Sequence, residues 1–165
     1  MVTSPFALIT TALAATTLVT ANHNVSFKNN CGQKISPLIK NTANGVTYRG
    51  GALSTGGSSS SSVPENWPSG IILGLRSGDA APDCPGCTRL ECDFSTAGYK
   101  NCNLSRVSGY SIPMGFSWTS GSCKGAACKS PTCPPSDAWV PGVDDGSSLR
   151  FCNVANVGLQ VTFCP

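Results

Sequence analysis

The amino-acid sequence predicts an all-β fold, a flattened β-sandwich with five disulfides and long loops. Three observations support this prediction. Short runs of alternating apolar and polar residues recur, whereas no window has the periodicity of a helix. Gly and Pro, which occur 18 and 12 times, separate these runs as turn residues do. The chain also has 10 cysteines, an even number that would form five disulfides in a secreted protein.

The expected strands follow from the spacing of apolar residues, which recur at every second position as on a half-buried strand. The clearest run covers 110–118, where five apolar side chains alternate and Pro113 indicates an edge strand or a bulge. The other apolar sets, in chain order, are Val25 and Phe27, then Ile71, Leu73 and Leu75, then Leu149 and Phe151, and finally Leu159, Val161 and Phe163.

Two segments lack this alternation. Residues 54–62 are a low-complexity run, Ser54-Thr-Gly-Gly-Ser-Ser-Ser-Ser-Ser62, which we expect to be a flexible surface loop. Residues 78–102 hold four cysteines, and we expect a long loop held by disulfides. No internal repeat divides the chain, so residues 22–165 are expected to form one domain.

Residues 1–21 have the features of a secretory signal peptide. The segment from Phe6 to Val19 is apolar and uncharged, and Val19-Thr20-Ala21 fits the small-residue cleavage pattern. The alternative, a membrane anchor, requires a longer apolar stretch, because about 20 residues are needed to cross a bilayer. We therefore expect no membrane span and a secreted protein, located outside the cell or in the cell wall.

The cysteines allow two interpretations of the central segment. Cys84, Cys87 and Cys92 have a spacing that could ligate zinc. Secretion and the presence of a single histidine favour disulfides, so we expect no metal and no cofactor. The cysteines are Cys31, Cys84, Cys87, Cys92, Cys102, Cys123, Cys128, Cys133, Cys152 and Cys164.

The charge balance excludes several classes of function. The chain has 11 basic and 8 acidic residues, and the basic excess is too thin and scattered for nucleic-acid binding. No glycine-rich loop is arranged to bind phosphate. The one histidine, His23, would lie on the mobile N-terminal end of the mature chain, which disfavours a Ser–His–Asp hydrolase. We expect a monomer.

Six segments together resemble the thaumatin-like protein family, over about residues 25–165. They are Phe27-Lys-Asn-Asn-Cys31, Leu73-Gly-Leu-Arg-Ser77, Asn103-Leu-Ser-Arg-Val-Ser-Gly-Tyr-Ser-Ile-Pro-Met114, Cys123-Lys-Gly-Ala-Ala-Cys128, Cys133-Pro-Pro-Ser-Asp-Ala-Trp-Val-Pro-Gly-Val-Asp-Asp145 and Val161-Thr-Phe-Cys-Pro165. The disulfide-rich second domain of large members is missing between Cys128 and Cys133. The chain is therefore similar to the small ten-cysteine type.

The resemblance implies a β-sandwich similar to the first domain of that family, and part of its disulfide pattern. Family pairing joins Cys31 to Cys164, Cys123 to Cys152 and Cys128 to Cys133. The four cysteines between residues 84 and 102 then pair among themselves in one of three ways, which the sequence leaves open.

The resemblance also implies a place for a glycan site, because an acidic cleft of large members is held responsible for binding β-1,3-glucan. By resemblance the glycan-binding residues here are Arg76, Asp93, Asp144 and Asp145. Glu91 is the alternative to Asp93, and two further family carboxylates fall on Asn103 and Ser108 and are lost. Asp93 with Asp144 or Asp145 is the weak candidate pair for catalysis.

Aromatic residues and sequons add candidates to this site. We expect Trp67, which follows the Ser-rich run, to be exposed and able to stack on a sugar, Trp118 to be in the core, and Trp139 to be in either position. Asn24 and Asn103 begin N-glycosylation sequons. A glycan on Asn103 would occupy the former cleft.

Three functional hypotheses follow from the resemblance. The first is a secreted, non-enzymatic defence or cell-wall protein that binds β-1,3-glucan or another wall polysaccharide, with antifungal action. The second is a protein inhibitor of a secreted xylanase or another glycosidase, acting through a loop at 54–68 or 78–92. The third is a weak endo-β-1,3-glucanase.

Overall fold

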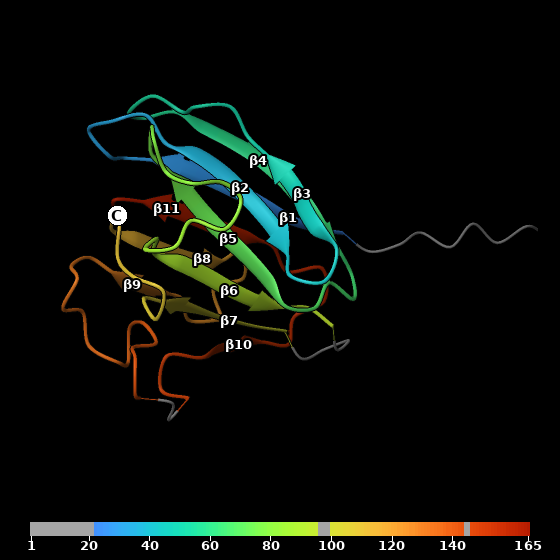
Figure 1. Cartoon of the computed structure of the whole chain (residues 1–165). Coiled ribbons are helices and arrows are strands. Elements are labelled where there is room, and N and C mark those ends of the chain that lie inside the picture. Colours follow the sequence, from blue (N-terminus) through green and yellow to red (C-terminus); the bar gives the residue numbers. More distant parts are fainter. Residues whose placement is uncertain (1–21, 96–99, 144–145) are drawn as a thin grey trace, which may run out of the picture.

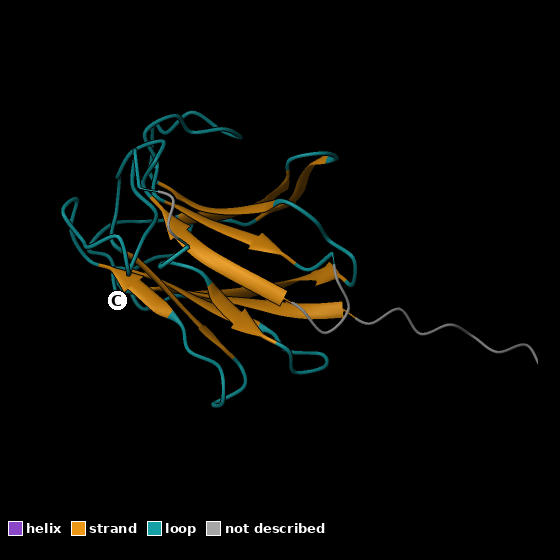
Figure 2. Cartoon of the chain, turned by 90° about the horizontal axis from the view of Figure 1, so that it is seen from below, coloured by secondary structure: helices purple, strands orange, loops and turns teal. Residues whose placement is uncertain are grey.

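The computed structural model describes residues 22–95, 100–143 and 146–165, and within them the chain forms eleven strands and no helix. The expected signal peptide at 1–21, and with it the prediction that this segment is cleaved, lies outside the described residues. In the described ranges no helix is long and apolar enough to cross a membrane. The strands form two sheets that pack face to face, which confirms the predicted flattened β-sandwich (Figures 1 and 2).

The first sheet has five strands and joins the two ends of the domain. Its order is β4 (Ser58–Pro64), β1 (Asn22–Asn29), β11 (Leu159–Phe163), β8 (Met114–Trp118) and β9 (Ala126–Cys128). Strands β1 and β11 run parallel, so Val25 lies opposite Leu159 and Phe27 opposite Val161. The other pairings in this sheet are antiparallel.

The second sheet has six strands, all antiparallel. Its order is β10 (Arg150–Cys152), β7 (Lys100–Ser105), β6 (Arg89–Asp93), β5 (Gly70–Leu75), β2 (Ser36–Asn41) and β3 (Gly45–Arg49). Consecutive hairpins link β5 to β6 and β6 to β7, which places three neighbouring strands in simple sequence order. This arrangement puts their outward side chains in straight rows across the sheet.

The main core fills the space between the sheets. Phe27 and Phe163 of the first sheet stack with ring centroids 6.1 Å apart and are fully buried. Ile72, Leu90 and Leu104 of the second sheet are each 0% exposed and belong to the same cluster. The alternation that predicted strands around Val25, Ile71 and Leu159 is confirmed.

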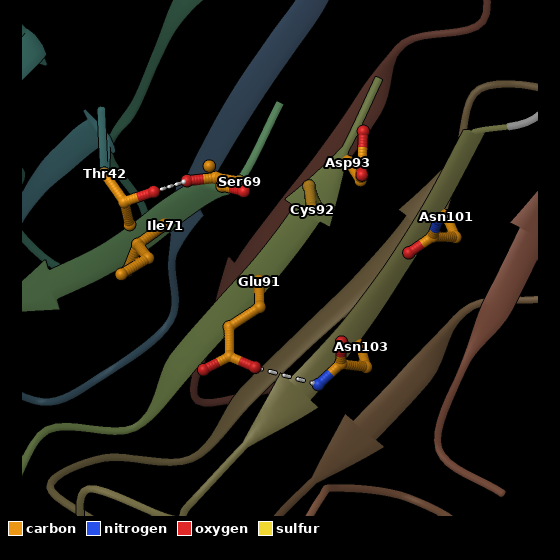
Figure 3. A pocket seen from close by; sticks show the side chains of 9 residues that line it. Thr42, Ser69, Ile71, Glu91, Cys92, Asp93, Asn101 and Asn103 are labelled. Carbon is orange, nitrogen blue, oxygen red and sulfur yellow. Dashed lines mark hydrogen bonds between the residues drawn. The ribbon is translucent and has the colours of Figure 1, made fainter. Parts of the chain in front are cut away.

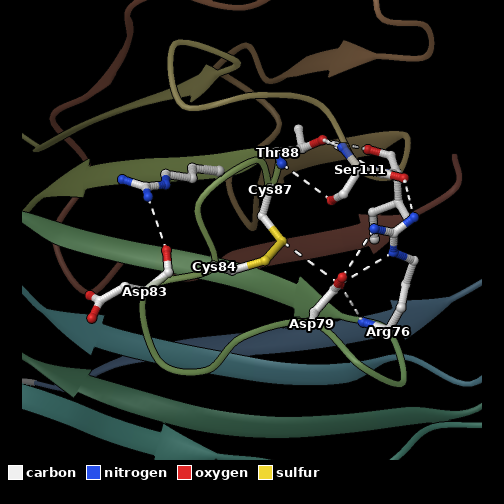
Figure 4. The surroundings of a disulfide bond; sticks show 9 residues. Arg76, Asp79, Asp83, Cys84, Cys87, Thr88 and Ser111 are labelled. Carbon is white, nitrogen blue, oxygen red and sulfur yellow. Dashed lines mark hydrogen bonds and ion pairs between the residues drawn. A yellow bond between two sulfur atoms is a disulfide. The ribbon is translucent and has the colours of Figure 1, made fainter.

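A second, smaller apolar cluster lies on the outer face of the six-stranded sheet. Leu38, Leu73 and Leu75 are buried there, although a sandwich normally exposes this face. The loop 76–88, with Cys84 and Cys87, covers them (Figure 4). The loop therefore divides the outer face into a covered apolar end and an uncovered end.

The ten cysteines form five disulfides, and no free cysteine remains. Three of the pairs are those that the family resemblance implies. The sequence left the other four cysteines open, and the structure pairs Cys84 with Cys87 and Cys92 with Cys102. The complete set is Cys31–Cys164, Cys84–Cys87, Cys92–Cys102, Cys123–Cys152 and Cys128–Cys133.

Two segments that we expected to be loops contain strands. The prediction of a flexible loop at 54–62 is wrong for most of its length, because residues 58–64 form β4 and pair with β1 over seven positions. Backbone pairing and the buried Val63 stabilise this strand, so composition alone misled us. The prediction of a loop at 78–102 is wrong after residue 88, where β6 and β7 form a hairpin joined by Cys92–Cys102.

The strand that we expected at 110–118 begins only at Met114, one residue after Pro113. The apolar pair that we expected near residue 150, Leu149 and Phe151, is not fully buried. Strand β10 covers only three residues, and Phe151 in its centre is 44% exposed.

His23 does not lie on a mobile end, which corrects another expectation. It is part of β1, and its ring is fully buried against Phe94. Its Nε2 lies 2.7 Å from Glu65 Oε2, and its Nδ1 lies 2.8 Å from the carbonyl oxygen of Val157. Both partners are acceptors, so both contacts are hydrogen bonds when both ring nitrogens carry hydrogen.

Glu65 also binds a cation from the other sheet. Its Oε1 lies 3.1 Å from Nζ of Lys100, a side chain only 2% exposed at the start of β7. Burial raises the pKa of Glu65, but hydrogen bonds and charges from Lys100 and His23 outweigh it and hold the pKa below its ordinary value. The three side chains thus form an ionic link between the sheets, which we call the His23–Glu65–Lys100 cluster.

Candidate functional site

A polar groove lies on the uncovered end of the outer face of the six-stranded sheet. Its volume is about 280 Å³, and strands β5, β6 and β7 form its floor. The lining residues are Thr42, Ser69, Gly70, Ile71, Glu91, Cys92, Asp93, Asn101 and Asn103 (Figure 3).

Strand register arranges the polar side chains of the groove in two rows. Glu91 on β6 lies directly opposite Asn103 on β7, and Asp93 lies opposite Asn101. Directly opposed residues of an antiparallel pair point to the same face. Each row therefore places one carboxylate beside one amide, and the pattern repeats about 7 Å further along the strands.

The first row is ordered by hydrogen bonds. Nδ2 of Asn103 donates to Glu91 Oε2 at 3.2 Å and to the carbonyl oxygen of Leu104 at 3.2 Å. Asn103 is 8% exposed, whereas Glu91 is half-buried, so the amide positions the carboxylate in the groove (Figure 3). Ile71 lies opposite Glu91 on β5 and contributes an apolar surface to the same row.

The second row forms the end of the groove. Asp93 is half-buried, and its Oδ1 accepts a hydrogen bond of 2.7 Å from the backbone N–H of Ser95. Asn101 on β7 is half-buried beside it. On the opposite wall, the Thr42 hydroxyl donates to the carbonyl oxygen of Ser69 at 2.9 Å, which fixes the loop ahead of β5 (Figure 3).

The arrangement is suited to bind hydroxyl groups. Carboxylate and amide oxygens accept hydrogen bonds, and amide N–H groups donate them, so each row can satisfy a group that both donates and accepts. An apolar side chain beside these groups can contact a C–H surface. Ligands that combine hydroxyls with C–H faces, above all sugars, fit this chemistry.

The two carboxylates rise from one face of one strand. Retaining glycoside hydrolysis needs two carboxyls about 5 Å apart, and inverting hydrolysis needs an acid and a base about 6.5–9.5 Å apart on opposite sides of the sugar. Glu91 and Asp93 are about 7 Å apart along β6 and point to the same face of the sheet.

The residues predicted to form the glycan site are only partly brought together. Asp93 lines the groove, together with its alternative Glu91. Arg76 lies at the other end of β5, beyond the apolar cluster, and does not line the groove. Asp144 and Asp145 lie outside the described residues, so the catalytic pairs that we expected them to form with Asp93 remain predictions.

Arg76 instead forms a local ion pair with Asp79 (Figure 4). Its Nη2 lies 3.0 Å from Asp79 Oδ1, and its backbone N–H donates to Asp79 Oδ2 at 2.8 Å. Burial raises the pKa of Asp79, but the hydrogen bonds and charge of Arg76 outweigh it and keep the pKa below its ordinary value. This pair holds the first turn of the 76–88 loop.

The expectation that Trp67 is exposed is wrong. Its side chain is 4% exposed and packs near Phe94, with ring centroids 6.2 Å apart. The ring also lies against the backbone of Gly70, where any Cβ would collide with it. A ring in this position has no open face for a sugar. Trp118 is buried as predicted, and Trp139 is half-buried.

The two sequons have different surroundings. Asn24 is exposed on the outer face of the five-stranded sheet. Nδ2 of Asn103, the atom to which a glycan would be attached, is engaged in the groove by Glu91 and by the Leu104 carbonyl. Glycosylation of Asn103 would replace these hydrogen bonds and fill the groove.

One group of three potential metal ligands occurs among the described residues, and its geometry favours the disulfide interpretation. Ligand atoms of Asp79, Cys84 and Cys87 lie within 4.8 Å of one another. The two sulfur atoms are bonded to each other, so they offer no thiolate to zinc.

Sequence reasoning missed the amide half of the groove. It considered Asn103 only as a lost carboxylate and a sequon, and it did not consider Asn101 or Thr42. A signal was present, because Glu91 and Asp93, like Asn101 and Asn103, are two positions apart, as residues on one face of a strand are. We overlooked it because residues 78–102 were interpreted as a loop.

No family model matches the chain, and no curated protein matches it in sequence. Solved structures do match it. A thaumatin-like xylanase inhibitor superposes with a TM-score of 0.64 at 21% identity, covering 86% of this chain and 99% of the inhibitor. The protein elicitor MoHrip2 from Magnaporthe oryzae superposes with a TM-score of 0.66 at 13% identity, covering 87% of this chain and 99% of the elicitor. At such identities the likeness concerns the fold alone.

Proposed function

We propose, from the premise that this chain has the thaumatin-like fold, that it is an extracellular polysaccharide-binding protein without hydrolytic activity. The ligand is a β-1,3-glucan of a cell wall, and the groove over β5, β6 and β7 binds it. The family resemblance of the sequence motifs supports the choice of glucan. The five disulfides support an extracellular location, because such bonds persist in oxidising compartments.

The observation that carries the proposal is the paired carboxylate and amide in each row of the groove. Glu91 beside Asn103 and Asp93 beside Asn101 present acceptors and donors at a regular interval along two strands. A polysaccharide presents hydroxyls at regular intervals too. The groove is open, so an extended chain can lie along it without threading through a tunnel.

Binding without hydrolysis agrees with the geometry of the two acidic side chains. Both carboxylates accept hydrogen bonds from N–H groups, Glu91 from Asn103 and Asp93 from the Ser95 backbone. Each carboxylate is thereby held by an N–H group at one oxygen, and the groove offers carboxylate acceptors and amide donors to sugar hydroxyls.

The test is retention of the purified protein on insoluble β-1,3-glucan, with xylan and chitin as controls and released reducing sugar measured in the same tubes. We expect retention on β-1,3-glucan and no sugar release. Glu91→Gln with Asp93→Asn should weaken retention roughly tenfold, because hydrogen bonds to charged groups are worth about 1.5–3 kcal/mol. The matched control is Asp83→Asn, which makes the same change on a side chain that is 68% exposed and outside the groove.

Two results would contradict the proposal. Retention unchanged in the Glu91→Gln, Asp93→Asn double variant would place binding elsewhere, and steady release of reducing sugar by the wild type would make the protein an enzyme. Melting temperatures of all variants show whether a loss of retention reflects unfolding, because Asp93 also orders Ser95.

A second candidate function is inhibition of a secreted glycosidase. It is favoured by the similarity to a xylanase inhibitor over 99% of that protein. The 76–88 loop is a rigid candidate contact, since the Arg76–Asp79 pair and the Cys84–Cys87 disulfide fix it. Loss of xylanase activity on adding the wild-type protein, restored with a variant changed at the exposed Pro85, would favour this function over glucan binding.

A further inference from the structure

A second, smaller hollow adjoins the groove at Asn103, which lines both. Its volume is about 170 Å³, and its other walls include Pro135, Trp139, Ser148 and Leu149. Strand β6 flanks one edge of β7, whereas these residues come from the segments that flank the other edge. The hollow therefore lies beside the groove, across β7 from β6.

The hollow forms where β7 changes its neighbour along that edge. Strand β10 pairs with residues 100–102, whereas Trp139 contacts the residues that follow Asn103. The backbone N–H of Trp139 donates to the carbonyl oxygen of Leu104 at 2.8 Å, and the Trp139 carbonyl oxygen accepts from the N–H of Arg106 at 2.9 Å. Asn103 lies between these two pairings, so its side chain lies next to the interval that separates them.

The walls of the hollow are fixed by one guanidinium group. Nη1 of Arg150 donates to the carbonyl oxygens of Ser147 and Leu149, at 2.9 and 3.0 Å. Nη2 of the same side chain donates to the carbonyl oxygen of Ser136. These carbonyls belong to the two loop segments that supply Pro135 and Leu149 to the hollow. One side chain thus holds both walls together, so the hollow is preformed.

Two polar groups that line the hollow have no partner in the described part of the chain. Ser148 is only 6% exposed, yet its hydroxyl makes no hydrogen bond there. The indole N–H of the half-buried Trp139 makes none either. Neither atom is sealed in the interior, so both reach the space that they line. Because buried polar groups are normally hydrogen-bonded, these two groups are available to whatever fills the hollow.

The chemistry of the hollow matches that of a sugar. Apolar walls from Pro135 and Leu149 can contact C–H groups, and a few polar groups in such a pocket orient what it binds. The Trp139 N–H only donates, whereas the Ser148 hydroxyl donates and accepts. A sugar ring presents C–H groups and hydroxyls together. The volume of about 170 Å³ suits one ring rather than a length of chain.

We infer that the hollow is a subsite for a single glucose unit that branches from a glycan bound in the groove. This inference rests on the proposed function and specifies its ligand as a branched β-1,3-glucan. The two polar rows follow one another along β6 and β7, so the main chain lies along these strands. The hollow lies at its flank, where only a group that projects sideways enters. In a β-1,3-linked chain the O6 hydroxymethyl groups are free and project from the rings, so a glucose attached through O6 can reach the hollow.

The experiment is calorimetric titration of the purified protein with two oligosaccharides. One is the linear hexasaccharide of β-1,3-glucan, and the other is the same hexasaccharide with one glucose attached through O6 of an internal unit. We expect wild type to bind the branched compound roughly tenfold more tightly, because the branch adds hydrogen bonds to Ser148 and Trp139 and apolar contact with the walls.

Variants of the hollow test whether it causes this preference. Ser148→Ala with Trp139→Phe removes both polar groups and keeps an aromatic ring, and Ser148→Leu fills the hollow. Both proteins should bind the two oligosaccharides equally, within about twofold, and should keep the wild-type affinity for the linear one. The matched control is Ser60→Ala, the same change at an exposed serine of the five-stranded sheet, which should leave the preference intact.

Melting temperatures show whether each variant is folded. If the larger changes unfold the protein, Ser148→Ala alone provides the test, because it removes one oxygen atom and leaves the walls in place. It should reduce the preference for the branched compound roughly threefold.

Each outcome separates the two proposals. Equal affinity of wild type for the linear and the branched compound overturns the branch subsite and leaves the groove proposal standing. A preference that persists in Ser148→Leu overturns the subsite as well. Weaker binding of the linear compound by Ser148→Ala also overturns it, because a main-chain sugar would then occupy the hollow. No binding of either compound by wild type overturns both proposals.

Discussion

The outer faces of the two sheets have the same backbone periodicity and very different chemistry. On the five-stranded sheet, register places Ser60, Ser26, Gln160 and Ser117 in one row across β4, β1, β11 and β8. This row contains only hydroxyls and one amide. On the six-stranded sheet, each of two equivalent rows carries a carboxylate and an amide, and Phe151 on β10 extends the row of Asp93 and Asn101.

The inner faces of the same strands do not differ in this way. Both are mainly apolar, because both contribute to one core that must exclude water, with His23 and Lys100 as the buried exceptions. Packing between the sheets therefore constrains every second residue in each sheet similarly, and it leaves the outward residues unconstrained except where the 76–88 loop covers them. The difference shows that the outward residues of one sheet can form a binding site on this fold without any change to the residues of the core.

The two sheets also differ in the length of chain that their associated disulfides close, and this difference gives the largest expected effect on stability. Cys31–Cys164 closes a separation of 133 residues behind the parallel pair β1 and β11, whereas Cys84–Cys87 closes a separation of 3 in the loop over the six-stranded sheet. Replacing Cys31 and Cys164 by Ala should cost about 5 kcal/mol of unfolding free energy, and replacing Cys84 and Cys87 about 2 kcal/mol. Denaturant unfolding of both double variants measures this difference, and equal losses would contradict the loop-length argument.

The His23–Glu65–Lys100 cluster joins the two sheets, and it predicts a dependence of stability on pH. Glu65→Gln should lower the unfolding free energy at pH 7 by about 3 kcal/mol, because it leaves the buried Lys100 without its carboxylate. Asp83→Asn, which breaks the Lys40–Asp83 pair at a largely exposed carboxylate, should cost less than about 0.5 kcal/mol. Urea unfolding at pH 7 checks both values.

The sign of the pH effect follows from the lowered pKa of Glu65 in the folded protein. Its contribution is complete above the unfolded carboxyl value of about 4.3 and is lost as the pH falls through the lower folded value. Wild type should therefore lose stability below about pH 4, and Glu65→Gln should lose less over the same range. Parallel acid profiles for the two proteins would rule out this role for the cluster.

The smallest effect is expected on the hydroxyl-rich face. Ser60 and Gln160 are exposed on the five-stranded sheet, so Ser60→Glu and Gln160→Glu should each change the unfolding free energy by less than about 0.5 kcal/mol. Glucan retention should stay within about twofold of wild type, since hydrogen bonds of the groove are untouched. A large loss of retention would show that this face, too, contacts the glycan, and the contrast between the faces would fail.

Particular residues show which strands could be predicted from the sequence and which could not. Alternation around Phe27, Ile72 and Val161 predicted strands correctly, because half-burial enforces a period of two. The run of serines did not predict β4, because its strand character comes from pairing with β1 and from the buried Val63, both distant from the local composition. The four cysteines of 84–102 hid a hairpin for the same reason.

The same distinction between local pattern and distant contacts applies to the candidate site. By itself the sequence determined an all-β chain with paired cysteines, since these depend on residue type and spacing, whereas the interpretation of 78–102 as a loop left Glu91 and Asp93 off any strand. Only the tertiary structure decided that Trp67 is buried, that Arg76 stays with Asp79, and that Asp93, Asn101 and Phe151 lie in one row. The physical reason is that register between strands and burial between sheets are set by contacts across the chain, which no local pattern encodes.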